Sequence, residues 1–446
     1  MNLAGALAIV YIILFIAVTA KRPKLALMLT FASAPFQNDL SGDLPVRFSL
    51  AEVNLVLSLL LVLVHTGPKR LRFGPLLIPV LLYFAVCMIS SLRAWRGTTT
   101  ISIMQTALYM IGAVLVFSSL GESIEAYKLS FYWLIAVGVF TGGPALVIPS
   151  SFLDLGLNKN GIGGSLACCL LVVTELWLNS NNPKHRRILL TSLVVIAGGL
   201  VMTLSRGSWL GALAGLMALF AIKAQFKALF QTLVVLAPVV AICWILLPAE
   251  SQDFATGFDV KRTNISARLD SIEFAERQFQ IEPILGVGVG LRKEFDATNV
   301  VMTVLAETGI LGLATFALIH VAFFWMVYTV RRRISPTSSA CSILAIGGAL
   351  LTSQVAHGLV DHYWSRGSLM LAWAGVGMVT RCYFDLGDVV FVAVARPLGR
   401  RMPSRPREMA AAVAPAAEFP ARMAPMTRPK RGHWNRPIRR LDTERD

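Results

Sequence analysis

Two arginines stand where a membrane protein would bind an anion. Arg206 follows an apolar segment in the sequence Leu204-Ser205-Arg206-Gly207, and Arg268 lies in a polar interval from about 250 to 300. A guanidinium at the end of an apolar segment is costly to bury unless it meets an anion or faces water. The pattern therefore predicts anion binding. The alternatives are interfacial placement of Arg206 and an ordinary surface ion pair of Arg268, such as one with Glu273.

Side chains that could move a proton lie in the same interval and in one other polar segment. Nine acidic residues fall between Glu250 and Val300, and the other segment covers 357–367. A general base must reach the proton that it removes, so it has to share a face with the arginines. The candidates are Asp296, Glu307, His357, Asp361 and His362. A helix-end position without chemistry fits both histidines equally well, and Glu307 equally fits a packing role with a hydrogen-bonded carboxylate.

These residues must be positioned by helices that cross a membrane. Hydrophobic residues make up 55% of the 446 positions and charged residues only 15%. A helix of about 20 apolar residues crosses the hydrocarbon of a bilayer and satisfies its own backbone groups there. The predicted fold class is all-α, a polytopic transmembrane helix bundle of about 12–13 spans. The predicted spans are 3–20, 25–37, 50–66, 75–92, 99–118, 129–148, 162–178, 188–203, 207–222, 229–247, 300–328, 338–356 and 368–384.

Basic residues in the short loops give the orientation, because cytoplasmic loops hold more of them than external loops. Placing Lys21, Arg22 and Lys24 inside also puts four later basic clusters inside, at 69–72, 184–187, 223–227 and 331–333. The polar segments 38–49, 149–161, 204–207, 249–299 and 357–367 then lie outside, and Arg93 and Arg96 are the one exception. Both candidate anion-binding arginines consequently lie on the external face.

The external loop 249–299 is predicted to contain a helix followed by a glycine turn. Apolar residues recur at helical spacing from Ser266 to Gln280, which predicts an amphipathic helix on the membrane surface or on the helix bundle. Gly286, Gly288 and Gly290 superficially resemble a phosphate-binding loop, but no strand precedes them and no βαβ unit surrounds them. We interpret them as a tight turn that leads back to the next span.

The chain is predicted to have two regions. Residues 1–395 form the membrane domain, and 396–446 form a disordered cytoplasmic tail rich in Pro, Ala and Arg, with thirteen basic and five acidic residues. Contact with anionic membrane lipids and a solvated, topology-fixing role both fit this tail. Nucleic-acid binding does not fit, because a basic folded face is missing.

Three further features bear on compartment and chemistry. The first apolar segment has its basic residues after it, so we interpret it as a retained helix and not as a cleaved signal. The six cysteines lie in or beside apolar segments without metal-ligand spacing and are interpreted as small hydrophobic residues. Glu175 lies within a predicted span, which makes it a functional candidate, although water could reach it near the helix end.

Several motifs, taken in order, resemble the O-antigen ligase and polysaccharide polymerase family of bacterial membranes. The similarity is strongest over about 160–330, and Asn158-Lys159-Asn160 also resembles the family's loop before its next span. The motifs are Leu204-Ser205-Arg206-Gly207-Ser208-Trp209-Leu210-Gly211, Arg268 in a long loop, Pro283 with Gly286-Val287-Gly288-Val289-Gly290, Asn299, and Glu307-Thr308-Gly309-Ile310-Leu311-Gly312.

This resemblance implies a multi-pass glycosyltransferase of the bacterial inner membrane. Such an enzyme transfers a glycan from an undecaprenyl-diphosphate carrier to a glycan or lipid-glycan acceptor on the external face, and so polymerises or ligates polysaccharide units. No metal, nucleotide sugar or other cofactor is expected. The resemblance assigns Arg206 and Arg268 to the donor's diphosphate, with Gly286, Gly288, Gly290 and Asn299 in support. Guanidinium groups fit phosphate oxygens and would stabilise charge on the leaving diphosphate.

One departure from the family concerns the acid or base. Many members have a histidine directly before this asparagine, and that histidine is thought to act on the acceptor hydroxyl. The chain has Thr298 there, and a threonine cannot serve as a base near neutral pH. The base is then a nearby carboxylate, Asp296 or Glu307, or a group of the last external loop, namely His357, Asp361 or His362. Otherwise the activity is changed or lost.

Two other classes of function stay open from the sequence. A transporter of lipid-linked oligosaccharide would have internal repeats and broken helices near the middle of the bilayer, and no clear repeat is visible. A catalytically inactive glycan-binding subunit is compatible with Thr298. Within the transferase class, the missing histidine slightly favours polymerisation of O-antigen or exopolysaccharide over ligation.

Overall fold

The computed structural model is a bundle of α-helices. It describes residues 3–36, 49–66, 71–95, 97–121, 124–147, 159–256, 263–291, 298–361 and 368–394, and among these residues no strand occurs. The predicted all-α, polytopic fold class is therefore confirmed. The predicted tail after residue 395 lies outside the described residues, as do Asp296 and His362.

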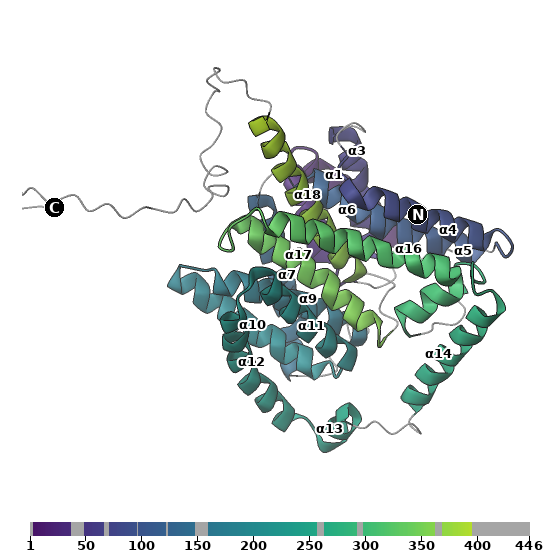
Figure 1. Ribbon diagram of the computed structural model, residues 1–446. Helices are drawn as coiled ribbons and strands as arrows, with labels where there is room; N and C mark the ends of the chain where they lie inside the picture. The colour runs from purple at the N-terminus through teal and green to yellow at the C-terminus, as the bar shows by residue number, and fades with distance from the viewer. Residues whose placement is uncertain are drawn as a thin grey trace, which may run out of the picture. The chain divides into compact units, whose positions relative to one another are not determined.

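Figure 1 shows the helices coloured in chain order. In chain order they are α1 (Leu3–Thr19), α2 (Pro23–Ser33), α3 (Leu50–Thr66), η2 (Gly74–Leu76), α4 (Leu77–Ser91), α5 (Gly97–Ala107), η3 (Leu108–Ala113), α6 (Val114–Ser119), α7 (Ile124–Val147), α9 (Lys159–Leu178), α10 (Pro183–Met202), α11 (Arg206–Lys223), α12 (Phe226–Leu246), α13 (Ala249–Thr256), α14 (Thr263–Ile281), α16 (Val300–Arg331), α17 (Ser339–Gly358) and α18 (Ser368–Val394).

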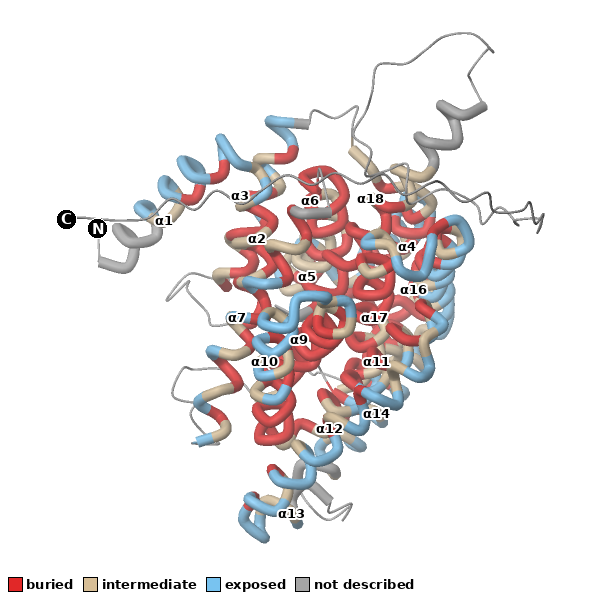
Figure 2. The backbone as a smooth tube through the Cα atoms, turned by 90° about the vertical axis from the view of Figure 1, so that its left-hand side faces the viewer, coloured by how far each residue is buried: buried red, intermediate tan, exposed pale blue. Residues whose placement is uncertain are grey.

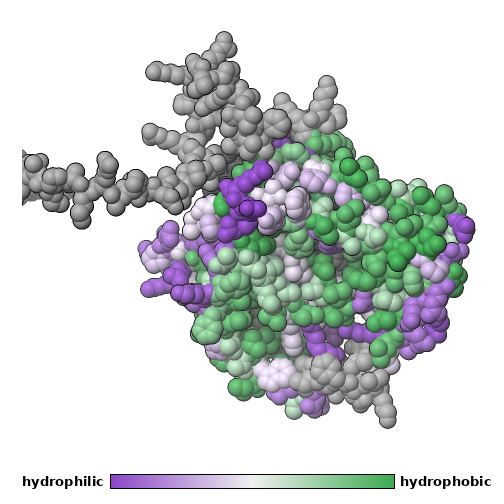
Figure 3. Space-filling view, viewed as in Figure 1, coloured by the Kyte–Doolittle hydropathy of each residue, from purple (hydrophilic) through white to green (hydrophobic). Residues whose placement is uncertain are grey.

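Helix length and composition fit a membrane protein. Within the described part of the chain, eight helices are long and apolar enough to cross a membrane. Their degree of burial separates a centre from a periphery, since 89% of the apolar stretch of α9 is buried but only 17% of that of α12. The outward faces of α4 and α16 are apolar, whereas the surface over α14 is hydrophilic (Figure 3). Such apolar faces are suited to lipid contact.

The buried core lies around α9, α11, α17 and α18 (Figure 2). Helix α11 packs along α17 through Gly207, Gly211 and Gly215, which recur every fourth residue and so share one face. A methyl group on Gly211 would lie 2.8 Å from the carbonyl oxygen of Ser353. Small residues let two helices approach until their backbones nearly touch, which is how membrane helices pack without large side chains.

Helix α16 carries a break that the sequence did not predict. The backbone of Gly309 is left-handed, with φ of 63°, so the long helix is two helices joined at a kink. The main chain just after α14 packs against this kink. Ile310 N donates to Pro283 O over 2.9 Å, and Leu311 N donates to Ile284 O over 3.3 Å. The kink therefore seats the chain that leaves α14.

Candidate functional site

Arg268 binds the end of another helix, far away in the sequence. From α14 its Nη1 donates to the carbonyl oxygen of Val360 over 2.9 Å, and its Nη2 lies 3.3 Å from Oδ2 of Asp361. The Asp361 side chain is only 2% exposed, against 33% for Arg268. Glu273 instead pairs with Arg277 over 3.3 Å, so the interpretation of Arg268 as a surface partner of Glu273 is wrong.

Asn299 holds the same stretch of main chain from a third element. Its Oδ1 accepts hydrogen bonds from the backbone of Val301 and Met302 over 2.9 and 3.1 Å and so caps the start of α16. Its Nδ2 donates to the carbonyl oxygen of Leu359 over 2.8 Å. Asn299 and Arg268 thus bind three successive residues. We call residues 357–361 the site turn.

Arg206 begins α11 beside the site turn. Leu204 has a left-handed backbone with φ of 51°, Ser205 directly precedes the helix without a capping hydrogen bond from its side chain, and Arg206 is the first helical residue. The next residue, Gly207, lies against His357, since a methyl group there would come within 2.6 Å of the imidazole Cδ2. Arg206 is half-buried at this point. The sequence motif thus brings the start of α11 onto the turn that Arg268 holds.

Lys159 is a third cation of the site. It is the first residue of α9, and it interacts electrostatically with Arg206, Arg268 and Asp361. The sequence analysis used Lys159 only as part of a family-like loop and missed its charge. A signal was available, because a lysine in a loop placed outside runs against the excess of basic residues in cytoplasmic loops.

The glycine run forms the tight turn that the sequence predicts. Gly286, Gly288 and Gly290 all have left-handed backbones, with φ of 73°, 102° and 117°. Val287 N donates to Ala306 O over 2.9 Å and Gly288 N to Glu307 O over 3.0 Å, so the turn lies along α16. A side chain on Gly286 would collide with the backbone of Glu307 at 2.4 Å. All three positions favour glycine for its conformation, and Gly286 also needs it for space.

Glu307 is bound to this glycine turn. Its carboxylate Oε1 accepts the backbone N–H of Gly290 over 2.9 Å, and its carbonyl oxygen accepts the hydroxyl of Ser90 over 2.6 Å. Its side chain is buried. This geometry matches the packing interpretation of Glu307, whereas its catalytic role stays a prediction.

Thr298 adopts an unusual backbone conformation for its residue type. Its φ is 52°, a left-handed region that β-branched residues rarely occupy. It directly precedes Asn299, which binds the site turn, so position 298 lies at the edge of the site. Of the other candidates, Glu175 lies in the last turn of α9, at the helix end opposite Lys159. Within the described residues, no group of three or more His, Cys, Asp or Glu side chains could hold a metal ion.

The site therefore draws on five helices: α9, α11, α14, the start of α16 and the end of α17. Three cations share the site: Arg268 pairs with the carboxylate of Asp361, and Lys159 interacts electrostatically with Asp361, Arg268 and Arg206. Such an arrangement can bind an anion with several negative oxygens, because guanidinium groups offer paired donors and all three charges add to the local potential.

Comparison with known proteins bears on this site. Residues 191–317 match the family model described as O-Antigen ligase. The chain has no match among the curated proteins. The matched segment contains Arg206, Arg268, the glycine turn and Asn299, whereas Lys159 and the site turn lie outside it. The match confirms the resemblance predicted from the motifs. It indicates a membrane function of the O-antigen ligase or polymerase type, with lipid-linked glycan substrates.

Proposed function

We propose, on the premise that residues 191–317 are an O-antigen ligase domain, that the protein is a membrane glycosyltransferase. It transfers a glycan from undecaprenyl diphosphate to a sugar acceptor at the external face of the bacterial inner membrane, and so polymerises or ligates polysaccharide units. The observation that carries the proposal is the meeting of Arg206 and Arg268 at the site turn. Arg206 is the first residue of α11 and Arg268 lies within α14, and the fold brings the start of α11 and the Arg268 side chain to the same turn.

The donor's diphosphate binds to Arg206 and Arg268, with Lys159 adding positive charge. In the structure Arg268 binds Asp361 and Val360. Phosphate oxygens compete for the same guanidinium, because charge-assisted bidentate bonds form with either anion. Donor binding thereby releases the Asp361 carboxylate. We assign Asp361 as the base because it lies on a diphosphate-binding arginine, whereas Glu307 is held by Gly290.

The transfer exchanges one bond for another. The acceptor hydroxyl oxygen bonds to the anomeric carbon of the donor sugar, and the bond between that carbon and the diphosphate oxygen breaks. The electron pair leaves with the diphosphate, and the hydroxyl proton passes to Asp361. Cations fixed at the leaving group stabilise the charge that develops there, and this type of stabilisation is often the largest contribution to catalysis.

The test is complementation of a strain that lacks this gene, at matched protein levels. Arg206→Ala and Arg268→Ala are compared with Arg277→Ala, a control on the same helix as Arg268 whose exposed pair with Glu273 should contribute little. Polymer and lipid-linked repeat units are both quantified. We expect the two site variants to lose polymer and accumulate repeat units at the external face, while Arg277→Ala behaves as wild type.

Other outcomes point to other functions. Repeat units that accumulate only on the cytoplasmic face would indicate a transporter. Normal polymer in both site variants would overturn the assignment of the diphosphate-binding residues. An inactive binding subunit would give a third pattern. The arginine variants would lose glycan binding, while substitution of Asp361, His357 or His362 would leave glycan transfer unchanged.

A further inference from the structure

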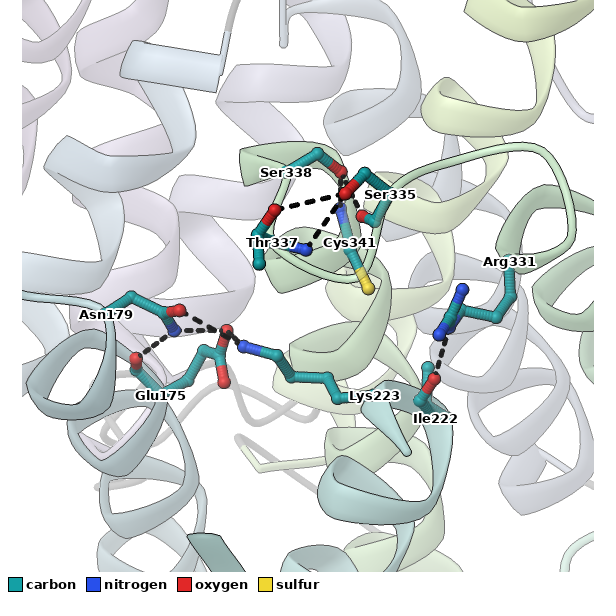
Figure 4. Close-up of polar contacts among 9 residues, drawn as sticks. All are labelled: Glu175, Asn179, Ile222, Lys223, Arg331, Ser335, Thr337, Ser338 and Cys341. Carbon is teal, nitrogen blue, oxygen red and sulfur yellow. Dashed lines mark hydrogen bonds and ion pairs between the residues drawn. The ribbon is translucent and has the colours of Figure 1, made fainter. Parts of the chain in front are cut away.

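A buried ion pair joins α9 and α11 at the helix ends opposite the site. Lys223 Nζ lies 2.6 Å from Glu175 Oε1, and the two side chains are 1% and 0% exposed. Asn179 completes the group, since its Nδ2 donates to the same carboxylate oxygen over 2.7 Å and its Oδ1 accepts from Lys223 over 3.3 Å. Figure 4 shows Lys223 reaching across to Glu175 and Asn179. The sequence analysis placed Lys223 in a basic cluster on the cytoplasmic side, and its burial in an ion pair was not predicted.

The last turn of α11 is also held from α16. Arg331 Nε donates to the carbonyl oxygen of Ile222 over 2.6 Å (Figure 4). The helix stops directly afterwards, because Ala224 has a left-handed backbone with φ of 55°. The same end of α11 is thus held twice, through the Lys223 side chain to α9 and through the Ile222 carbonyl oxygen to α16.

The ion pair lies at one end of an interface in which glycines bring α9 and α11 close together. Near the site, a methyl group on Gly163 of α9 would lie 3.0 Å from Cβ of Ser208 and 3.1 Å from Cβ of Ser205. Midway, one on Gly215 would lie 2.5 Å from Leu171. Small residues allow close approach but offer few interlocking side chains that resist sliding. A buried charge, by contrast, must keep its partner, because separation leaves it uncompensated.

The two ends of α11 are linked by a rigid helix. Arg206 is its first residue and Lys223 its last, and an α-helix rises about 1.5 Å per residue, which puts them roughly 26 Å apart. A shift of α11 along its axis by one residue, about 1.5 Å, would therefore break the 2.6 Å contact between Lys223 and Glu175. The same shift would displace Arg206 by the same distance. The same holds for α9, which has Lys159 at one end and Glu175 in its last turn.

We propose that the Glu175–Lys223 pair is a positioning device that fixes the axial register of α11 against α9 and thereby sets Arg206 beside Lys159. Glu175 and Lys223 act through Arg206 and do not touch substrate. The functional part of this inference rests on the proposed diphosphate site, whereas the register itself does not.

Disulfide trapping tests the register without any substrate. A chain with Gly163→Cys and Ser208→Cys should form a disulfide on mild oxidation, and one with Gly163→Cys and Ser205→Cys serves as the reference pair. We expect Lys223→Met to change the ratio of the two disulfide yields about threefold or more, since non-additive coupling is expected for linked sites. Lys227→Met, at an exposed lysine four residues further on, should not change it. An unchanged ratio in Lys223→Met would overturn the proposal.

A charge exchange distinguishes loss of the ion pair from a general folding defect. Glu175→Lys combined with Lys223→Glu restores an oppositely charged pair, and we expect it to return the ratio to that of the wild type. If Lys223→Met does not accumulate, Glu175→Gln takes its place, because it keeps the shape of the side chain. Exchange without recovery of the ratio would mean that charge pairing does not set the register.

Binding of undecaprenyl diphosphate by the purified full chain tests the connection to Arg206. We expect Lys223→Met to raise the Kd about tenfold in the wild type and in an Arg268→Ala background, but far less in an Arg206→Lys background. Equal effects in all three backgrounds would indicate a general structural role and overturn the positioning proposal. A third outcome separates the two proposals. If Lys223→Met changes the disulfide ratio but neither arginine variant changes the binding of undecaprenyl diphosphate, the proposed function is wrong and the register inference still holds.

Discussion

At the scale of single residues, the side-chain amide of Asn299 makes two separate contacts, one through its oxygen and one through its nitrogen. Its oxygen caps α16, and its nitrogen binds the carbonyl oxygen of Leu359 in the site turn. We expect Asn299→Ala to lose both and to destabilise the protein by about 1 kcal/mol, the usual value of a helix cap. Asn299→Asp keeps the acceptor and loses the donor, so it should retain the thermal stability of the wild type but transfer glycan more slowly. Equal activity in the Asp variant and wild type would contradict this division.

Asp361 and Glu307 are both buried carboxylates, yet their surroundings differ. Asp361 meets a guanidinium of the site, while Glu307 accepts a hydrogen bond from the backbone of Gly290. We expect Asp361→Asn to lower the rate of glycan transfer by about 10²-fold or more, the usual effect of losing a general base, and to tighten donor binding, because a neutral amide competes less with the diphosphate for Arg268. Glu307→Gln should instead lower the melting temperature clearly, while it reduces the rate of glycan transfer much less than Asp361→Asn does. The measurements are turnover with purified protein and thermal unfolding. The reverse pattern would make Glu307 the base.

At the scale of elements, the glycine turn 286–290 is the joint between α14 and α16. Gly286 has a φ of 73° and no room for a side chain against Glu307. We expect Gly286→Ala to cost more than about 2 kcal/mol, because conformational strain and collision combine. Gly97→Ala is the matched control, since a methyl group there meets nothing within 4 Å. Folded yield after detergent extraction compares the two, and similar yields would show that the turn tolerates a side chain.

Sequence reasoning found the elements better than their long-range contacts. The predicted spans 162–178 and 188–203 correspond to α9 and α10, and the predicted loop helix 266–280 corresponds to α14. Apolar length and helical periodicity are local signals, so such elements can be read from a sequence. The Glu175–Lys223 pair joins residues 48 positions apart, and no local pattern encodes that distance. The break at Gly309 also escaped, because its cause is the segment after α14 that packs into it.

The candidate site could be predicted only in part, because its long-range contacts leave no local pattern in the sequence. Arg206 and Arg268 were identifiable from their motifs and from the cost of placing guanidinium groups near a membrane. Arg268 contacts residues 360 and 361, and Gly207, next to Arg206, lies against His357; this arrangement depends on the packing of α11 on α17, which the sequence does not reveal. The family-like asparagine was assigned a supporting role, but its bond to Leu359 could only come from the structure.

At the scale of the whole molecule, the proposed orientation can be tested by labelling. All six cysteines are buried, so the native background should be low. We expect Arg277→Cys to react with a membrane-impermeant maleimide on cells whose outer membrane alone is permeabilised. Lys184→Cys should react only after the inner membrane is opened, because basic loops stay in the cytoplasm. Reaction of both positions, or of Lys184→Cys alone, in the first condition would reverse or refute the topology.

The contact between Arg268 and Asp361 also dictates an order of events during synthesis. The two residues are 93 positions apart, and the helices α16 and α17 lie between them. Arg268 leaves the ribosome first and has no site turn to bind until both later helices have been made and inserted. On the proposed topology, α14 lies outside the membrane with this contact unmade until α17 has been inserted. A ribosome that stalls in this interval would release a chain with both proposed diphosphate-binding arginines and no assembled site.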